Sequence, residues 1–327
     1  MSLGQSLEQP PWAADPTWQE HRQALVTFPS GFTVLELCAG AGTASLALKL
    51  LLGSECLAGA WDTDSNLECI YERVHGPHAQ AHLGPQRGDI LRTPLNAFPC
   101  ANAVVCGPPC QPYSSYGQRG ALDDPRARPF HRCIEIIAEL DSRRTREVNQ
   151  ASLMFVIIEN TLGITQRPGG VQEPPLKGFL ASLRRQLGSE WSFTFMQVNS
   201  ADFGLPQSRT RVYVVGRRLE FYQPRRLPGH PERFHHRVSS GQLLDLTDNR
   251  NATGYTFLAD EGMRAWKGKF RAAMLDKRNK GTFAFVEVGR DPTPRTQWRG
   301  ATAKVDICEC LRARGPQLHV FRWERAS

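Results

Sequence analysis

A cysteine in the sequence GPPCQP (107–112) is the strongest candidate for a nucleophile. The loop follows the apolar run AVVC (103–106), and its prolines hold Cys110 close to the point where that run ends. Thiolate is the nucleophilic form of cysteine, and backbone N–H groups with a nearby cation favour it. Cys106, inside the apolar run, is instead predicted to be a small buried side chain.

Two further motifs carry charged side chains. Glu159 follows the apolar run MFVII (154–158) in the motif ENT, as either a helix cap or a hydrogen-bonding group in a site. Arg209 and Arg211 alternate in QSRTR (207–211), so a strand would place both guanidinium groups on one face. The alternative for these arginines is a surface ion-pair face.

The segment ELCAGAG (36–42) is typical of a tight turn between a strand and a helix that lies against a ligand. A dehydrogenase, or a turn without any ligand, would also fit this segment. Asp62 ends the next predicted strand, where it could accept hydrogen bonds from ribose hydroxyls, and Asp89 follows Gly88 where a third strand would end. Both acids could instead cap helices. The three features together favour a nucleoside cofactor, with Asp89 accepting from the exocyclic amine of adenine.

The surrounding pattern predicts an α/β fold with a doubly wound, Rossmann-like, mostly parallel sheet. The expected strands are 33–38, 57–62, 103–106 and 154–159, with FTFMQV (193–198) and RVYVVG (211–216) as an antiparallel hairpin near the sheet edge. The expected helices cover 15–28, 43–52 and a segment through Tyr71, with DICECLRA (306–313) as a C-terminal helix.

Composition narrows the class of protein. The chain has 327 residues, 40% hydrophobic and 22% charged, which excludes collagen-like and mostly disordered proteins. No apolar run reaches the length of a membrane span, and the N-terminal residues do not resemble a secretory signal. Nine irregularly spaced cysteines indicate reduced thiols in an intracellular protein, in the nucleus of a eukaryote or the cytoplasm of a prokaryote.

The excess of positive over negative charge lies in the last third of the chain. Residues 1–216 carry 18 basic and 20 acidic side chains, whereas residues 217–327 carry 22 and 12. Such a field attracts a polyanion, nucleic acid first, although a solvated basic face fits equally well. We expect an N-terminal extension (1–32), a catalytic domain (33–216), a small basic target-recognition region (217–305) and a C-terminal helix and tail (306–327). The pair His235-His236 with Cys308 and Cys310 lacks familiar zinc spacing, so no metal is expected.

The ordered motifs ELCAGAG, WDTD, GDI, GPPCQPYSSYG, ENT and QSRTR resemble those of the DNA cytosine-5 methyltransferases. The resemblance spans residues 33–216 and implies S-adenosylmethionine as cofactor, with S-adenosylhomocysteine as product. It implies that Cys110 adds to C6 of cytosine, that Glu159 protonates N3, and that Arg211, with Arg209 nearby, supports the carboxylate and the base carbonyl. The cofactor-binding residues that it implies, or that the motifs place in the same pocket, are Cys38, Ala39, Gly40, Gly42, Thr43, Asp62, Thr63, Asp89, Ile90 and Pro108.

The resemblance implies double-stranded DNA as the partner, with the target base flipped out of the helix. RNA enzymes that use two cysteines usually have one near Thr161, and ENT has none, which favours the DNA type of mechanism. One RNA-methylating branch shares the DNA-type motifs, so an RNA cytosine-5 methyltransferase remains an alternative. The second alternative is an inactive family member that binds DNA or a partner.

The family's closing Gly-Asn segment does not appear before Ser327. We therefore expect a more open cofactor pocket, which the helix at 15–28 partly covers and which a protein partner or DNA completes. Substrate recognition is expected in residues 217–305, whose aromatic side chains Tyr222, Phe234, Tyr255, Trp266 and Trp298 alternate with basic residues.

Overall fold

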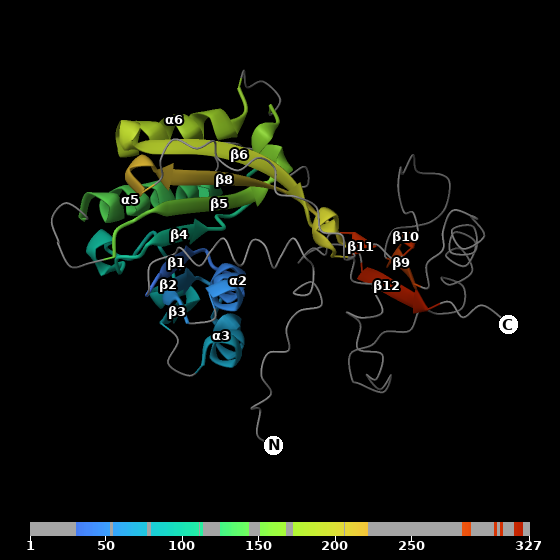
Figure 1. The fold of residues 1–327 in the computed structure, drawn as a ribbon. Coiled ribbons are helices and arrows are strands. Elements are labelled where there is room, and N and C mark those ends of the chain that lie inside the picture. The colour runs from blue at the N-terminus through green and yellow to red at the C-terminus, as the bar shows by residue number, and fades with distance from the viewer. Residues whose placement is uncertain are drawn as a thin grey trace. The chain divides into compact units, whose positions relative to one another are not determined.

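The computed structural model describes residues 31–52, 55–76, 80–110, 112–113, 125–143, 151–167, 173–205, 207–221, 283–288, 304–305, 308–309 and 317–322. The strands in these ranges belong to two compact units. The first contains a seven-stranded sheet, and the second contains five further strands (Figure 1). The predicted helix at 15–28, the aromatic residues of the predicted recognition region and His235-His236 all lie outside the described residues.

The large sheet is mostly parallel, as predicted. Its strands, in spatial order, are β3 (Ala81–Leu83), β2 (Leu57–Asp62), β1 (Val34–Leu37), β4 (Ala103–Cys106), β5 (Phe155–Thr161), β8 (Thr210–Arg218) and β6 (Trp191–Asn199). Strands β3 through β5 pair in parallel, and β8 pairs antiparallel with β5. The chain moves outward from β1 to β3 and then returns to β4 on the other side of β1. This change of direction between β1 and β4 is where open α/β sheets bind ligands.

Five helices accompany this sheet in the described part of the chain: α2 (Thr43–Leu52), α3 (Glu68–His75), α4 (Gly84–Arg87), α5 (Arg128–Arg143) and α6 (Pro175–Leu187). Short 3₁₀ turns lie between elements: η3 (Ser65–Leu67), η4 (Leu95–Ala97), η6 (Pro125–Ala127), η7 (Leu162–Thr165), η8 (Gly188–Glu190), η9 (Ser200–Phe203) and η10 (Leu219–Phe221). Helices α5 and α6 pack against each other, and the rings of Phe130 and Phe179 stack with centroids 3.6 Å apart.

Apolar side chains cover both faces of the sheet, which is the pattern of a buried parallel sheet. On one face, Leu35 and Leu37 of β1 join a large core that includes the apolar side chains of α5 and α6. On the other face, Val34 joins a smaller core against which Leu48 of α2 packs. The alternation along β1 follows the two-residue period of a strand. The short run VLEL is therefore fixed in register from both sides.

The third strand ends six residues before Asp89, and not at Gly88 as predicted. Gly84, with φ of +88°, and Pro85 end β3 and begin the short helix α4, which carries the chain to Gly88. A Cβ atom at Gly88 would lie 1.8 Å from the carbonyl oxygen of Asp62. Glycine is therefore required for this turn, which brings the backbone beside Asp89 against the end of β2.

The second unit contains two small sheets. Strands β10 (Lys304–Val305), β9 (Phe283–Val288) and β12 (Gln317–Arg322) form an antiparallel sheet, and β7 (Gln207–Ser208) pairs in parallel with β11 (Cys308–Glu309). The prediction of a helix over 306–313 is thus wrong at Cys308–Glu309, because their backbone groups pair with a strand about 100 residues earlier. The domain boundaries at 32, 216 and 305 stay predictions.

Within the described residues, no helix combines the length and the apolar character that crossing a membrane requires.

Candidate active site

The loop that carries Cys110 begins where β4 ends, directly beside the turn that follows β1. The ladder between the two strands continues into both turns, because the Gly107 N–H donates to the Leu37 carbonyl at 3.0 Å. A Cβ atom at Gly107 would lie 3.2 Å from the carbonyl oxygen of Cys38, so glycine permits this close approach. The predicted cofactor turn and the predicted nucleophile loop are therefore neighbours.

Two contacts hold the loop on either side of Cys110. The buried amide of Asn160 donates from Nδ2 to the Pro108 carbonyl at 3.3 Å, and the Tyr113 N–H donates to the Cys110 carbonyl at 3.0 Å. The ring of Tyr113 is buried and meets Phe179 of α6 edge to face. Asn160 lies within the ENT motif but was not predicted as a site residue, because the type of a side chain does not show which carbonyl it reaches.

Cys110 differs from its neighbouring cysteines in exposure. Cys106 and Cys133 are completely buried, whereas Cys110 is partly exposed. A hydrogen bond to Cys133, followed by burial, raises the pKa of the Cys38 thiol well above its ordinary value, and a hydrogen bond with Cys106 and burial do the same for Cys133. Both thiols are therefore protonated at neutral pH and are poor nucleophiles.

Glu159 and Arg211 form an ion pair beside this loop. Arg211 lies opposite Thr161 in the antiparallel ladder of β5 and β8, and Glu159 lies opposite Tyr213, so the two charged residues are diagonal neighbours on one face. The Arg211 Nε and Glu159 Oε1 atoms are 2.8 Å apart, and the side chains are 16% and 30% exposed. The carboxylate is thus oriented and still accessible.

Arg209 lies in the second compact unit, in the segment that joins β6 to β8. Its N–H donates to Asn199 Oδ1 at 3.2 Å, and its carbonyl accepts from the Ser200 N–H at 3.1 Å. These bonds fix the backbone of the QSRTR motif. The predicted role of the Arg209 guanidinium beside Glu159 stays a prediction.

The turn after β1 adopts a conformation that requires small residues. Gly40 and Gly42 have φ of +55° and +69°, and Cys38 has φ of +52°, in the left-handed region that side chains other than glycine rarely adopt. The Gly40 N–H donates to Asp62 Oδ2 at 2.8 Å, and the Ala39 N–H donates to the Trp61 carbonyl at 3.0 Å. The end of β2 thereby shapes the turn. Of the remaining predicted cofactor residues, Thr43 and Thr63 are exposed, and Pro108 and Ile90 are buried.

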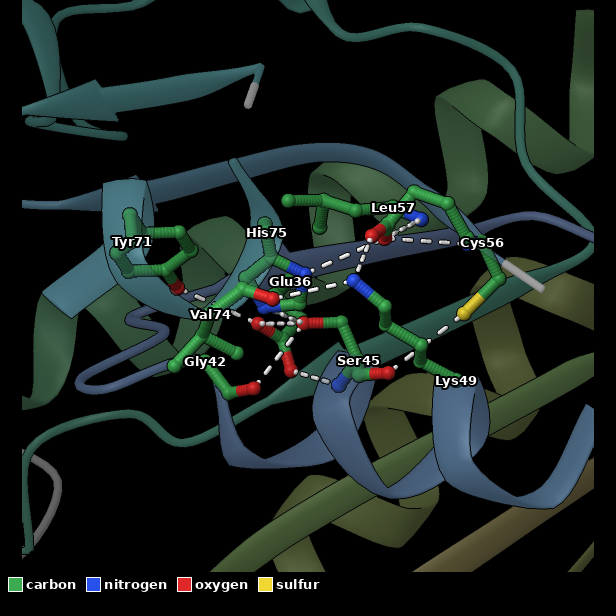
Figure 2. A network of polar contacts seen from close by, with 10 residues as sticks. Glu36, Gly42, Ser45, Lys49, Cys56, Leu57, Tyr71, Val74 and His75 are labelled. Atoms are coloured by element: carbon green, nitrogen blue, oxygen red, sulfur yellow. Dashed lines mark hydrogen bonds and ion pairs between the residues drawn. The ribbon is translucent and has the colours of Figure 1, made fainter. Parts of the chain in front are cut away.

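The N-terminus of α2 is already occupied by a carboxylate. Figure 2 shows buried Glu36 at this helix end, where its Oε1 accepts from the Ser45 N–H at 2.6 Å and its Oε2 accepts from the Tyr71 hydroxyl at 3.3 Å. Burial raises the pKa of this carboxyl, and hydrogen bonds from Ser45 oppose the rise. In dinucleotide-binding proteins the pyrophosphate takes this position at the helix end. Glu36 therefore argues against the dehydrogenase alternative and favours a nucleoside cofactor without phosphate.

Ser45, His75 and Glu55 form a chain that resembles a hydrolase triad but cannot act as one. The Ser45 Oγ and His75 Nε2 atoms are 3.1 Å apart (Figure 2). The His75 Nδ1 atom lies 3.2 Å from Glu55 Oε1. Ser45 is completely buried and its hydroxyl also contacts Glu36 Oε2 and the Gly42 carbonyl. No substrate reaches this hydroxyl, so the chain serves to fix α2 and α3.

Asp62 and Asp89 retain hydrogen-bonding capacity for a ligand. Asp62 accepts from the N–H groups of Gly40 and Asp64, one at each oxygen, and Asp89 Oδ1 accepts from the Leu91 N–H. A carboxylate accepts about four hydrogen bonds, so each has sites left. Both carboxylates also contribute, after the hydrogen bond to Cys133 and burial, to the raised pKa of Cys38. Asp89 Oδ2 also pairs with Arg92 Nε, an exposed side chain, at 3.3 Å.

The described residues contain no group of three or more His, Cys, Asp or Glu side chains arranged to hold a metal ion.

Comparisons with known proteins show which family this chain matches. A family model described as C-5 cytosine-specific DNA methylase matches residues 32–284. The type II methyltransferase M.MthTI of Methanothermobacter thermautotrophicus is 23% identical over 93% of this chain and 89% of its own length. M.HpaII of Haemophilus parainfluenzae is 33% identical over 57% of this chain, which spans 46% of that relative. The fold is similar to that of a Spodoptera frugiperda DNMT2 mutant, with a TM-score of 0.51 and 20% identity over 72% of this chain and 65% of that one.

Proposed function

Because the chain belongs to the C-5 cytosine-specific DNA methylases, we propose that it transfers a methyl group from S-adenosylmethionine to C5 of cytosine in DNA. The observation that carries the proposal is the position of partly exposed Cys110 beside the cofactor turn, on the same edge of the sheet as the Glu159–Arg211 pair. The two relatives named above are type II methyltransferases, which supports a DNA substrate.

Cys110 supplies the nucleophile in this proposal. Its thiolate adds to C6 of the cytosine ring, and the electron pair of the C5–C6 bond becomes available at C5 for the new bond to carbon. After methylation, a base such as water takes the C5 proton, and the electron pair of that C–H bond restores the C5–C6 double bond as the Cys110 thiolate leaves. The proton on N3 then returns to Glu159. Because these steps need both faces of the ring, the base must leave the duplex stack.

Glu159 supplies the proton in this proposal. Addition to C6 increases the basicity of N3, and a protonated Glu159 at that atom would neutralise the charge as it develops. Arg211 holds one oxygen of the Glu159 carboxyl, and this ion pair fixes the orientation of the other oxygen, which is the one proposed to face N3. The same guanidinium carries further N–H groups that could donate to the carbonyl oxygen of the base.

We expect Glu159→Gln to lower kcat by about 100-fold, because a carboxamide retains hydrogen bonds but cannot transfer the proton. S-adenosylmethionine affinity, measured by calorimetry, should not change. Glu173→Gln is the control, since Glu173 is exposed and pairs with Lys177 on the surface. A Glu159→Gln variant with full kcat would show that the proton comes from another group.

S-adenosylmethionine supplies an electrophilic methyl group on a positively charged sulfur, and the residues at the turn suit this molecule. Asp62 has acceptor capacity for ribose hydroxyls, and Asp89 has it for the adenine amine. The open space beside Gly40, where a Cβ atom would meet nothing within 4 Å, leaves room for the ligand along the turn. The carboxylate of Asp62 has the sign of charge that attracts a sulfonium.

The basic last third of the chain supports DNA as the partner, because each phosphate that is neutralised releases counterions. We expect binding of duplex DNA to weaken by at least about 100-fold between about 50 and about 200 mM salt. Fluorescence anisotropy across a salt series measures the slope. Replacing Lys277, Arg278 and Lys280 by Gln should reduce that slope, whereas replacing Arg184 and Arg185, which are exposed on α6, should not. Equal slopes for both variants would contradict a basic DNA-binding region after residue 217.

The direct test is incubation with methyl-labelled S-adenosylmethionine and either duplex DNA or RNA, followed by digestion and detection of 5-methylcytosine. The proposal requires label in DNA. Label confined to RNA would assign the chain to the RNA alternative, and absence of label with retained DNA binding would assign it to the inactive one. Because the proposed substrate is cellular DNA, we propose that the protein acts in the nucleus of a eukaryote or the cytoplasm of a prokaryote.

A further inference from the structure

Two arginines on one face of α5 hold the segment that follows Asp89. Arg132 and Arg143 are eleven residues apart, which is about three turns of an α-helix and places them on the same side of it. Each guanidinium donates to two backbone carbonyls of the segment from Ile90 to Phe98 and pairs with a glutamate of its own helix. The two side chains are 18% and 11% exposed. The two arginines therefore have the same number and kind of contacts and a similar exposure. They differ in which part of the segment from Ile90 to Phe98 they contact.

Arg132 contacts both ends of the turn that carries Asp89. Its Nε donates to the Ile90 carbonyl at 3.1 Å, and one terminal nitrogen donates to the Thr93 carbonyl at 2.8 Å. The other terminal nitrogen pairs with Glu135 Oε2 at 2.7 Å. All three nitrogens of a planar, always charged group are thus used, and only arginine offers this geometry.

The conformation of this turn sets the direction of the Asp89 carboxylate. The Asp89 carbonyl accepts from the N–H groups of Arg92 and Thr93 at 3.0 and 3.1 Å. Asp89 Oδ1 accepts from the Leu91 N–H at 2.9 Å, and Asp89 Oδ2 pairs with Nε of the exposed Arg92 side chain, in the same turn, at 3.3 Å. These bonds form only while residues 89–93 keep this turn. The guanidinium that fixes the Ile90 and Thr93 carbonyls therefore also fixes the carboxylate that is proposed to accept from the adenine amine.

We propose that Arg132 is a positioning residue for the cofactor: it holds the turn after β3 and α4 so that Asp89 is oriented toward adenosine before the ligand binds. The inference rests on the proposed function, since it takes S-adenosylmethionine as the ligand of Asp89. Arg132 touches no reacting atom in this scheme. Without Arg132 the turn is less ordered in the free protein. Ordering it when the cofactor binds then lowers the affinity for the cofactor.

Arg143 provides the internal control. It donates to the carbonyls of Leu95, in η4, and Phe98, directly after η4, which lie six and nine residues beyond Asp89. Arg132→Met and Arg143→Met each remove two hydrogen bonds to carbonyls and one ion pair while keeping most of the aliphatic stem. Both variants should lower Tm by a similar few degrees. Only the first loosens the Asp89 turn.

The experiment measures binding of S-adenosylmethionine by calorimetry, steady-state kinetics and amide hydrogen exchange of the ligand-free protein. Arg132→Met should raise Kd and KM for S-adenosylmethionine about tenfold with kcat within about twofold of the unmodified protein. Arg132→Lys, which can still reach one carbonyl, should recover about half of that loss in logarithmic terms. Exchange at Leu91 to Thr93 should rise in Arg132→Met and not in Arg143→Met.

An equal loss of affinity in Arg132→Met and Arg143→Met, or unchanged affinity in Arg132→Met, would overturn the positioning role and leave the proposed function intact. If Arg132→Met does not fold, Arg132→Lys provides the test. Unchanged affinity of Arg132→Lys for S-adenosylmethionine, together with raised exchange at Leu91 to Thr93, would also overturn the positioning role. An unmodified protein that does not bind S-adenosylmethionine would instead contradict the proposed function itself, and this inference with it.

Discussion

Cys110→Ala is expected to reduce methyl transfer at least about 1,000-fold, because the variant has no group that can add to C6 and activate C5. The thermal unfolding temperature should change little, since the side chain is partly exposed and its loop is held through the carbonyls of Pro108 and Cys110 rather than through the thiol. Transfer of labelled methyl groups to duplex DNA, measured next to differential scanning calorimetry, separates the two effects.

Cys106→Ala is the matched control for this variant. Cys106 lies four residues earlier, in β4, and is completely buried, so its loss should lower the free energy of unfolding by about 1 kcal/mol and leave methyl transfer active. DNA that contains 5-fluorocytosine should become covalently attached to the unmodified protein and to Cys106→Ala, but not to Cys110→Ala. Attachment that persists in Cys110→Ala would identify a different nucleophile.

Local sequence pattern predicted much of the sheet correctly. The bounds of β2, β4 and α2 agree with the expected segments, because short apolar runs there are delimited by glycine, proline or a charged residue. The adjacent strands β6 and β8 confirm the expected hairpin. In each case the residues that determine the element lie inside it or next to it.

Elements that depend on distant partners were not predictable in this way. The strand β11 exists through its pairing with β7, about 100 residues away, and the sequence around Cys308 has the composition of a helix. The third strand has only three residues, AHL, which show no alternation. Its end is set by Gly84 and Pro85, and the approach of Gly88 to Asp62 is visible only in three dimensions.

In the candidate site, too, the residues with local sequence signals were predicted and those that act on distant segments were not. The types and spacing of Cys110, Glu159 and Arg211 indicated their chemistry, and their roles stay predictions until tested. The residues that hold them were missed, since Asn160 and Arg132 act on backbone carbonyls of other segments. Every residue has a carbonyl, so no sequence pattern indicates which of them a side chain will reach.

Arg218 is a second residue whose importance the sequence did not indicate. It is the last residue of β8, its side chain is 3% exposed, and it pairs with Asp141 of α5, Glu190 of η8 and Glu220 of η10. Glu190 and Glu220 are more than half exposed, but Asp141 is only 15% exposed. Arg218 therefore compensates a largely buried carboxylate and joins the end of β8 to α5.

We expect Arg218→Met to lower the free energy of unfolding by about 3 kcal/mol, because removing one partner of a buried ion pair leaves the other charge without compensation. Urea unfolding followed by circular dichroism measures the loss. Lys177→Met, which breaks the exposed pair with Glu173, is the control and should cost less than about 1 kcal/mol. If Asp141 is the group left uncompensated, adding Asp141→Asn to Arg218→Met should recover part of the stability, since the carboxamide carries no charge. A double variant that is less stable than Arg218→Met by the full cost of Asp141→Asn alone would show that the two side chains are not coupled.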